Sequence, residues 1–489
     1  MLPSAAELVA RFLRANGYTE TLTSFIQEAG LTYEAGVTTG DEVTIDQILQ
    51  EKKTFDMSLN FEKLGVDDKN CGWQNPAPSN PTILSSLPTK SNILSVHLLS
   101  LILSTSAGPQ STIAATTADR RLNFIDPLVP SLPLIRSYPN FQDSPILDLL
   151  VINCQYLLAA SMSGRLLFYD TATEKILDER KDHTKYLVKL ASWSDGLSTS
   201  IIATAGWDAK VVLYRVSVVS SLNPKLGEPI ATIELPSIPE TIAFIQSPDT
   251  AEPILLLTRR DSTFLYYYSL PTRRENDAVV TLLGKQNLTP HSTAWVSFSP
   301  SDVQLCPTDP SLAAIATSST PHMRVIIVRL LIPPKTHSAS NIHAVALDPQ
   351  QDPTSTVDPI LDSGVTLTQA SQERASLLVQ DREEAAIIIN INTMAPQTAY
   401  STPNLVWRPD GSGIYVSSDD GIIRGFEATT GKLMTSLEAH DAGSKLRCLW
   451  AGRVKGELNS SSDHNYGTNG EEYLISGGFD QKLILWNSL

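Results

Sequence analysis

The pattern of hydrophobic and polar residues divides the chain into a short helical part and a long part rich in strands. The first apolar positions recur at the spacing of one helix face, and they are Leu8, Val9, Phe12 and Leu13. Ser4 with Glu7 forms an S-x-x-E capping box before this set. A second apolar set, Leu22, Phe25 and Ile26, follows the helix stop at Asn16-Gly17. The sequence therefore predicts two short helices, and such a small pair needs a partner surface to cover its apolar faces.

The residues that follow this hairpin predict a connector. Thr44 and Gln47 offer a second capping box, and a further helical stretch is expected from Phe55 to Leu64. The three prolines of NCGWQNPAPSNP mark a linker that ends near Pro81. We therefore expect residues 1–36 to form the helical hairpin, residues 37–81 a helical and Pro-rich connector, and residues 82–489 a separate domain.

A different unit recurs after residue 82. In each unit a turn is followed by a strand that ends on an apolar or aromatic residue, and the units are ADRRLNFID, SGRLLFYD, WDAKVVLYR, RDSTFLYYY, DDGIIRGFE and FDQKLILWN. An apolar run precedes each turn, so each unit predicts a β-hairpin. Further strands lie before the hairpins, as in ILDLLVIN, and after them, as in PIATIELP. Four strands in about 40–45 residues are typical of one blade of a β-propeller.

The amino-terminal residues resemble the LisH motif. The match rests on the two apolar sets, on Gly17-Tyr18 at the turn, and on Phe25 and Glu28 in the second helix. LisH motifs typically form homodimers through a four-helix bundle. The resemblance therefore implies a homodimer whose contacts are made by Leu8, Val9, Phe12, Leu13, Tyr18, Leu22 and Phe25. The alternative is an amphipathic hairpin that packs on its own chain.

Residues 82–489 resemble the WD-repeat family, most closely in the last two units. The strict Trp-Asp ending is replaced by pairs such as Tyr169-Asp170 and Trp486-Asn487. The resemblance implies a mainly β fold, a propeller that follows a small α-helical hairpin. Residues 294–330 form one further candidate blade, and Ala375 to Thr393 predict the hairpin of another. Seven or eight blades therefore stay open, with seven favoured because it is the commoner number in the family.

The last unit contains only three strands and ends almost at the carboxyl terminus. An unpaired strand edge loses ladder hydrogen bonds and invites aggregation. The strand-like segment TILSSLP, residues 82–88, has no other place in the repeats. We predict that it pairs with Leu483 to Trp486 as the outermost strand of the last blade and so closes the ring.

Composition and charge limit the possible functions. The formal net charge of -15 disfavours nucleic acid as the main ligand, because phosphate binding needs clustered Lys and Arg. The four cysteines lack the spacing of a zinc site and are expected to be reduced thiols. Charged residues interrupt the amino terminus where a signal peptide needs an apolar core. We therefore expect a protein of the cytoplasm, the nucleus or both, with no cofactor, no metal and no membrane partner.

Several residues are candidates for chemistry or for binding. His440, Ser476 and Asp480 have the residue types of a hydrolase trio. WD repeats use the same types in a structural hydrogen-bond network within one blade, and the resemblance assigns that role to His440, Ser476, Asp480 and Trp486. A similar set of residues recurs in a second unit, and its members are His183, Thr204, Asp208 and Tyr214. Because a protein needs an active site only once, this partial repetition favours the structural role. No catalytic residue is expected.

The exposed rim of the propeller is a second place to look for binding residues. The candidates are Tyr266 to Tyr268, the pairs Arg259-Arg260 and Arg273-Arg274, and Trp207. Strand packing is the favoured interpretation for the tyrosines, and solvated turns for the arginines. The acid pairs Asp419-Asp420 and Glu383-Glu384 are expected in hairpin turns, where acids stay solvated.

These features predict a non-catalytic scaffold that homodimerises through the hairpin and binds protein partners through the propeller. Two specific alternatives are a subunit of a ubiquitin-ligase complex and a regulator of dynein or microtubules. The competing class is an enzyme or small-molecule binder that uses the central channel of the propeller. A cluster of buried charged residues at the mouth of the channel would support that competing class.

Overall fold

The computed structural model describes residues 5–37, 44–45, 72–73, 75–194, 199–217, 224–270, 280–290, 298–333, 369–454 and 471–488. These residues belong to two compact units, Met1–Cys71 and Gly72–Leu489. The predicted helical stretch from Phe55 to Leu64 lies outside the described residues. No helix within them has both the length and the apolar character that are needed to cross a lipid bilayer.

The first unit contains the predicted helical hairpin. Helix α1 (Ala5–Ala15) packs against α2 (Thr19–Glu28), and Gly17 adopts a positive φ of 74° in the turn between them. The residues after α2 fold back onto α1, where the Arg14 guanidinium donates to the carbonyls of Tyr33 and Ala35, both at 3.0 Å. A Cβ at Gly36 would lie 2.7 Å from the Ala10 backbone, so this close approach requires glycine.

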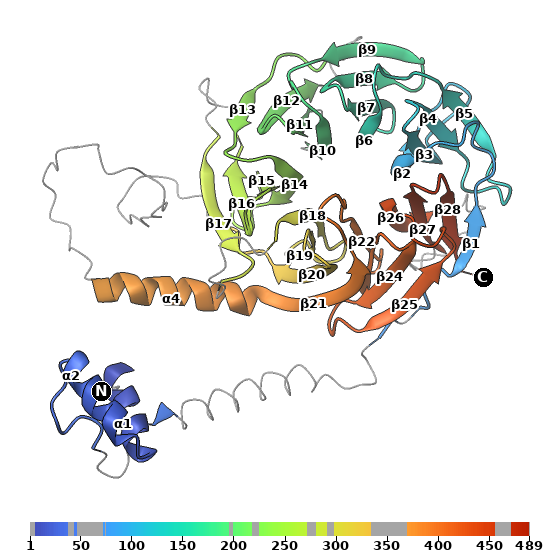
Figure 1. The fold of residues 1–489 in the computed structure, drawn as a ribbon. Helices are drawn as coiled ribbons and strands as arrows, with labels where there is room; N and C mark the ends of the chain where they lie inside the picture. The colour runs from blue at the N-terminus through green and yellow to red at the C-terminus, as the bar shows by residue number, and fades with distance from the viewer. Residues whose placement is uncertain are drawn as a thin grey trace, which may run out of the picture. The chain divides into compact units, whose positions relative to one another are not determined.

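The second unit is a ring of seven four-stranded antiparallel sheets in the described part of the chain (Figure 1). Each sheet is given from its inner to its outer strand, and the first three are β2 (Ile93–Leu101), β3 (Gln110–Thr117), β4 (Leu122–Ile125) and β5 (Leu134–Tyr138); β6 (Ile146–Ile152), β7 (Tyr156–Ser161), β8 (Leu166–Asp170) and β9 (Lys175–Arg180); and β10 (Leu187–Ser194), β11 (Thr199–Gly206), β12 (Lys210–Ser217) and β13 (Ala231–Glu234). The next three are β14 (Pro239–Gln246), β15 (Pro253–Arg259), β16 (Phe264–Ser269) and β17 (Leu282–Asn287); β18 (Pro300–Leu305), β19 (Leu312–Thr317), β20 (His322–Arg329) and β21 (Ile387–Pro396); and β22 (Leu405–Trp407), β23 (Gly413–Val416), β24 (Ile422–Glu427) and β25 (Leu433–Glu438). The last sheet is β26 (Leu446–Val454), β27 (Glu471–Gly478), β28 (Leu483–Asn487) and β1 (Asn80–Ile83). The structure therefore has the predicted propeller fold, with seven blades.

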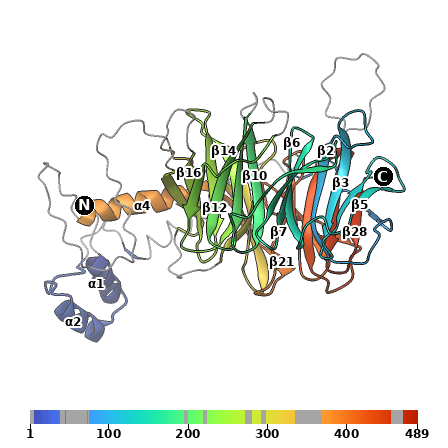
Figure 2. The same cartoon turned by 90° about the horizontal axis from the view of Figure 1, so that it is seen from above.

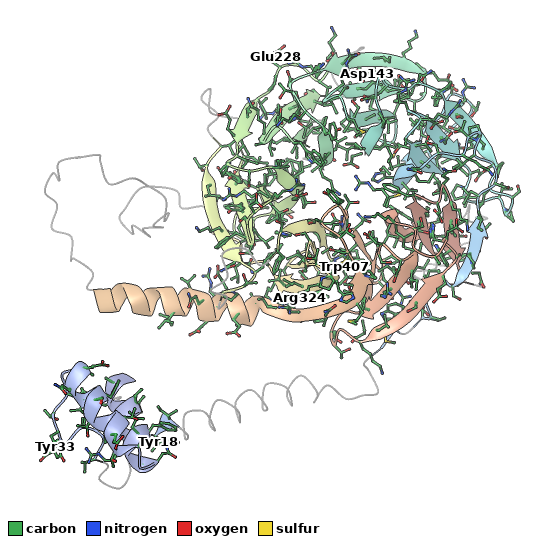
Figure 3. All side chains as sticks on the ribbon, viewed as in Figure 1. Tyr18, Tyr33, Asp143, Glu228, Arg324 and Trp407 are labelled. Atoms are coloured by element: carbon green, nitrogen blue, oxygen red, sulfur yellow. The ribbon has the colours of Figure 1, made fainter. Side chains whose placement is uncertain are left out.

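The apolar core lies between neighbouring blades. The second and third strands of a blade are covered on both faces, so they read as continuous apolar runs such as LLFYD in β8 and TSIIATAG in β11. Figure 2 shows the blades edge-on, with strands that run between the two faces of the ring. Trp407 of β22, labelled in Figure 3, donates from Nε1 to the Gln304 carbonyl of the preceding blade at 2.8 Å. A cluster of buried apolar side chains lies at each junction in the described part of the ring and joins each blade to the next.

The ring closes as the sequence predicts. Strand β1 pairs antiparallel with β28, with Thr82 opposite Leu485 and Ile83 opposite Ile484. The pairing begins at Asn80, two residues earlier than expected. Pro81 is tolerated there because an outermost strand needs ladder hydrogen bonds on one side only. The chain thus joins its first and last strands in one blade.

One predicted hairpin is wrong. Residues 375–393 contain the end of helix α4 (Gln369–Ala386) and then part of β21, which is the outer strand of the β18 blade. The run SLLVQDREEAA has no Gly, Pro or Asn to make a turn, and most of its residues favour helix. Glu383 lies in this helix rather than in a turn, and its carboxylate accepts a hydrogen bond from the Asn287 backbone at 2.8 Å. No eighth blade is present in the described part of the chain.

The neighbouring candidate blade is placed with one correction. Its inner strand begins at Pro300, after most of AWVSFSP, and residues 291–297 lie outside the described residues. The expected surface insertions at residues 333–374 and 456–472 also lie mostly outside them. Helix α4 contacts β17 and β21 and projects away from the ring in both ribbon views.

Candidate functional site

The last blade brings together the predicted trio of His440, Ser476 and Asp480. His440 Nδ1 lies 2.8 Å from the Asp480 carboxylate, and His440 Nε2 lies 2.8 Å from Ser476 Oγ. Trp486 Nε1 donates to the same hydroxyl at 2.9 Å. Ser476 is 0% exposed, so no substrate can reach it. These hydrogen bonds join a loop, a strand and a turn of one blade. The Ser476 hydroxyl is closed off from solvent and cannot act on a substrate.

The second network has similar geometry. His183 Nδ1 lies 2.9 Å from Asp208, and His183 Nε2 lies 2.9 Å from Thr204 Oγ1. The Tyr214 hydroxyl donates instead to Asp182 at 2.7 Å. Burial by itself would raise the pKa of Asp208, but the hydrogen bonds from His183 and from the Thr184 backbone lower it overall. Both networks therefore hold an ionised carboxylate under a loop.

The predicted dimerisation residues lie on the helical hairpin. Leu22 is buried, whereas Tyr18 is 53% exposed. The other members are half-buried in one chain, and they are Leu8, Val9, Phe12, Leu13 and Phe25. Ala10 is the other fully covered apolar side chain of the described hairpin. Part of the apolar surface of the two helices thus stays open to a partner.

The strongest candidate site is the mouth of the central channel, at the end where the inner strands begin. All seven inner strands line a cavity of about 780 Å³ there. In six of them the pairing register slips by one residue close to the start of the strand, which is the mark of a β-bulge. The bulged residues are Leu94, Leu147, Val188, Glu240, Ser301 and Arg447. All six line the cavity, and Pro403 completes the ring before β22.

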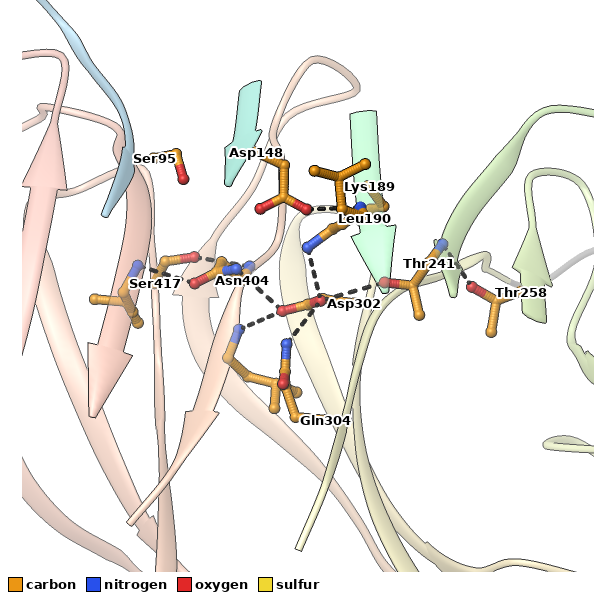
Figure 4. A network of polar contacts seen from close by, with 12 residues as sticks. Ser95, Asp148, Lys189, Leu190, Thr241, Thr258, Asp302, Gln304, Asn404 and Ser417 are labelled. Atoms are coloured by element: carbon orange, nitrogen blue, oxygen red, sulfur yellow. Dashed lines mark hydrogen bonds and ion pairs between the residues drawn. The ribbon is translucent and has the colours of Figure 1, made fainter. Parts of the chain in front are cut away.

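A polar belt lies one residue further along the inner strands (Figure 4). Its centre is Asp302, which is 1% exposed and accepts hydrogen bonds from Asn404 Nδ2 at 3.0 Å and the Leu405 backbone at 3.2 Å. Lys189 Nζ lies 3.4 Å from the same carboxylate. The attraction of Asp302 raises the pKa of Lys189, which keeps the ammonium charged inside the channel.

The belt also links blades through backbone groups. The Asp148 carboxylate accepts from the Leu190 backbone at 2.8 Å, and the Asn404 side-chain oxygen accepts from the Leu449 backbone at 3.0 Å. Each contact joins an inner strand to the inner strand of the next blade. Most of the belt is therefore accounted for by its role in holding the ring together.

The channel contains a second grouping of Ser, His and Asp side chains. His97 Nε2 lies 2.9 Å from Ser95 Oγ and 3.2 Å from Asp148 Oδ1. A Ser-His-Asp relay uses the two ring nitrogens for different partners, whereas here one nitrogen contacts both groups. This geometry does not support a nucleophile activated by His97.

The remaining charges at the mouth differ in how they are paired. Arg260 Nε lies 2.6 Å from Glu240, and its guanidinium lies over the Trp207 ring at 5.4 Å. Burial raises the pKa of Glu240 although Arg260 opposes the shift. Arg447 has no hydrogen-bond or ion-pair partner among the described residues, and burial lowers its pKa. The charged cluster that would favour a ligand-binding channel is thus present.

These channel residues were not predicted from the sequence. A charged residue stands near the start of several inner strands that are otherwise apolar, as in ILDLL, LVKLA and KLRCL. The channel residues could have been looked for from this charged residue, because it recurs in several repeated units. Of the predicted rim residues, Trp207 and Arg260 do line the mouth, whereas Tyr266 and Tyr267 are buried in the sheet as expected. Arg273-Arg274 lie outside the described residues.

The His, Cys, Asp and Glu side chains of the described residues decide whether a metal site or a reactive thiol is present. Within the described ranges no three His, Cys, Asp or Glu side chains gather as metal ligands would. Cys154, Cys306 and Cys448 are free thiols. Burial raises the pKa of the Cys448 thiol to about 12, so this side chain is a structural group at neutral pH.

Two family models match the chain. One is described as UCP007778, beta-propeller domain, and matches residues 140–450; the other is described as UCP007778, LisH domain, and matches residues 6–32. No curated protein matches the chain. The resemblance of the hairpin to LisH is confirmed, whereas the WD-repeat resemblance stays a prediction because neither description names that repeat. The propeller model alone covers more than half of the sequence, and the chain belongs to the UCP007778 family, with a LisH domain followed by a β-propeller.

Proposed function

We propose that this protein is a non-catalytic scaffold that homodimerises through its LisH domain and binds protein partners through the propeller. The observation that carries the proposal is the mouth of the channel, where bulged residues of six inner strands line a cavity of about 780 Å³. A β-bulge re-aims a side chain, and bulges are frequent beside functional sites. A cavity of this size is within the usual range for ligand sites.

The side chains around the mouth support a protein ligand. Trp207 stacks on Tyr186 with ring centroids 4.9 Å apart, and Tyr400 is 90% exposed. Trp, Tyr and Arg are enriched where protein interfaces gain most of their binding energy. Both Ser-His-Asp groupings in the propeller lack the features of an active site, one because it is sealed and the other because its histidine uses a single nitrogen.

Dimerisation would double the number of channel mouths in one molecule. Two linked sites bind a multivalent partner more tightly than either site alone. The half-buried apolar residues of the hairpin support this part of the proposal, since a second copy would cover them. We place the protein in the cytoplasm, the nucleus or both, as one subunit of a larger complex. A ubiquitin-ligase complex and a dynein or microtubule complex are the specific candidates.

A second candidate function is the binding of a small molecule in the channel, with or without catalysis. The charged cluster around Asp302 and the unpaired Arg447 favour it. The internal hydrogen bonds of the belt favour the scaffold, because they leave most of these groups already satisfied.

Affinity purification of the tagged full-length chain, followed by mass spectrometry, tests the scaffold proposal. We expect a reproducible set of co-purifying proteins that is absent when the tag is expressed alone. Recovery of the chain by itself would contradict the proposal. A stoichiometric small molecule in the purified protein would favour the second candidate.

A further inference from the structure

The order of the blades places Arg447 at the end of a continuous apolar arc. Around the ring, β26 neighbours β2, β2 neighbours β6, and β6 neighbours β10. Arg447 is the bulged residue of β26, and the bulged residues of the next three inner strands are Leu94, Leu147 and Val188. The rest of the ring is polar or small, with Glu240, Ser301 and Pro403. The ring of bulged residues therefore presents one cation beside three aliphatic side chains.

Three acids near the channel are satisfied within the protein. Asp302 is paired with Lys189 and accepts from two groups of the β22 blade. Asp148 is hydrogen-bonded to the Leu190 backbone, and Glu240 is paired with Arg260. Arg447 differs, since no described residue offers it an acceptor. A guanidinium that is partly removed from water without a partner costs free energy, which a ligand oxygen can recover.

The chemistry of the mouth favours a carboxylate over a phosphate. A guanidinium binds a carboxylate through two parallel hydrogen bonds. A dianionic phosphate would bring a second negative charge towards Asp148, Glu240 and Asp261, which line the same cavity. Because the apolar arc begins next to Arg447, a ligand that carries an aliphatic group beside its carboxylate matches both features.

We propose that the mouth of the channel binds an extended segment of a protein partner, with one Asp or Glu side chain held by Arg447 and an adjacent aliphatic side chain packed on Leu94, Leu147 and Val188. The proposal rests on the proposed scaffold function and names the chemistry of its partner. It also assigns Arg447 as the residue that sets specificity.

The test uses the full-length chain and synthetic fluorescent nonapeptides whose binding is measured by anisotropy. The central residue is Glu, Gln, Lys or phosphoserine, and the flanking residues are either Leu or Ser. We expect the Glu peptide with Leu flanks to bind most tightly. Arg447→Gln should weaken its binding about 30-fold or more, the change that loss of a desolvated charge pair produces. Arg447→Lys keeps the positive charge but lacks the planar guanidinium that donates two parallel hydrogen bonds, so it should bind the Glu peptide with intermediate affinity.

The matched control is Arg324→Gln, which makes the same chemical change at an exposed position of β20 outside the cavity (Figure 3). It should bind like the wild type. Leu147→Ser should reduce the advantage of Leu flanks over Ser flanks. Arg447→Gln should unfold at the wild-type temperature or above it, because Arg447 contacts no described polar partner and its partial burial costs free energy.

Several outcomes would overturn this inference. They are equal binding of Glu and Gln peptides, tighter binding of phosphoserine than of Glu, binding of free glutarate as tight as that of the best peptide, and unchanged Glu preference in Arg447→Gln. The failure of the scaffold proposal looks different, since affinity purification of the wild-type chain would then recover no partner. Partners that remain bound equally to the wild type and to Arg447→Gln would overturn only the assignment of Arg447.

Discussion

Ser476 holds the buried network of the last blade together. Its hydroxyl contacts His440 Nε2 and accepts the Trp486 N–H. Replacement by Ala leaves both nitrogens buried without a partner, so Ser476→Ala should lower the free energy of unfolding by about 2 kcal/mol. Chemical denaturation of the full chain measures this change. Ser436→Ala, at an exposed position of β25, is the control and should have no effect. Equal stability of the two variants would contradict the structural role.

The same network predicts a response to acid. Burial alone would raise the pKa of Asp480, but hydrogen bonds from His440 and from backbone groups lower it below its ordinary value of 3.8. A carboxyl with a lowered pKa stabilises the folded state above the unfolded pKa, and this stabilisation is lost as the pH falls through the folded value. The free energy of unfolding should therefore decline below pH 3.8, and Asp480→Asn should flatten that decline. Parallel pH profiles of the two proteins would argue against this contribution.

The buried network of the last blade could be predicted from the sequence more fully than the mouth of the channel. His440, Ser476, Asp480 and Trp486 recur with a recognisable order in a repeated unit, so their contacts could be predicted. For Arg447 and Asp302 the sequence offered only a charged residue near the start of an inner strand, because their positions in space depend on a β-bulge and on the curvature of the ring. Both are properties of strand pairing in three dimensions and leave no local turn signal.

At the level of the elements, the segment before β1 is clamped to the propeller. Arg408 is fully buried, pairs with Glu472 of β27 at 2.5 Å, and donates to the Asn75 carbonyl at 3.1 Å. Its guanidinium also lies over the Trp73 ring at 4.3 Å. A side chain at Gly425 would collide with that ring, so the glycine makes room for it. This clamp and β1 fix the start of the propeller to its end.

The clamp and β1 predict the effect of shortening the chain. A chain that begins at residue 72 should keep the denaturation midpoint of the intact propeller. A chain that begins at residue 86 should lose about 3 kcal/mol or more, since it exposes the edge of β28 and leaves Arg408 without two of its acceptors. Chemical denaturation with a light-scattering check for aggregates compares the two. The same midpoint for both chains would show that β1 does not close the ring.

Helix α4 illustrates why one element was predicted wrongly. Leu377, Leu378 and Val379 are three adjacent apolar residues, which suggests a strand when read alone. In the structure they are exposed on a helix. Short apolar runs do not distinguish helix from strand, whereas the lack of Gly, Pro and Asn and the many helix-favouring residues in SLLVQDREEAA do favour a helix over a hairpin. The mistaken hairpin was also the reason for considering an eighth blade.

At the scale of the whole molecule, the two units have different tasks in this account. The propeller is a closed ring, and closure allowed its strand order to be predicted from the repeats and from the need to pair the last strand. The described LisH residues leave several apolar side chains partly exposed, and a second copy would cover them. We propose that this domain joins two propellers into one molecule.

The molar mass in solution tests that claim most directly. Light scattering coupled to size-exclusion chromatography should give twice the mass of one chain for the full-length protein. Deletion of residues 1–36 should give the mass of one chain, with a circular dichroism spectrum and a denaturation midpoint that show an intact propeller. The same number of chains per particle with and without residues 1–36 would contradict the claim.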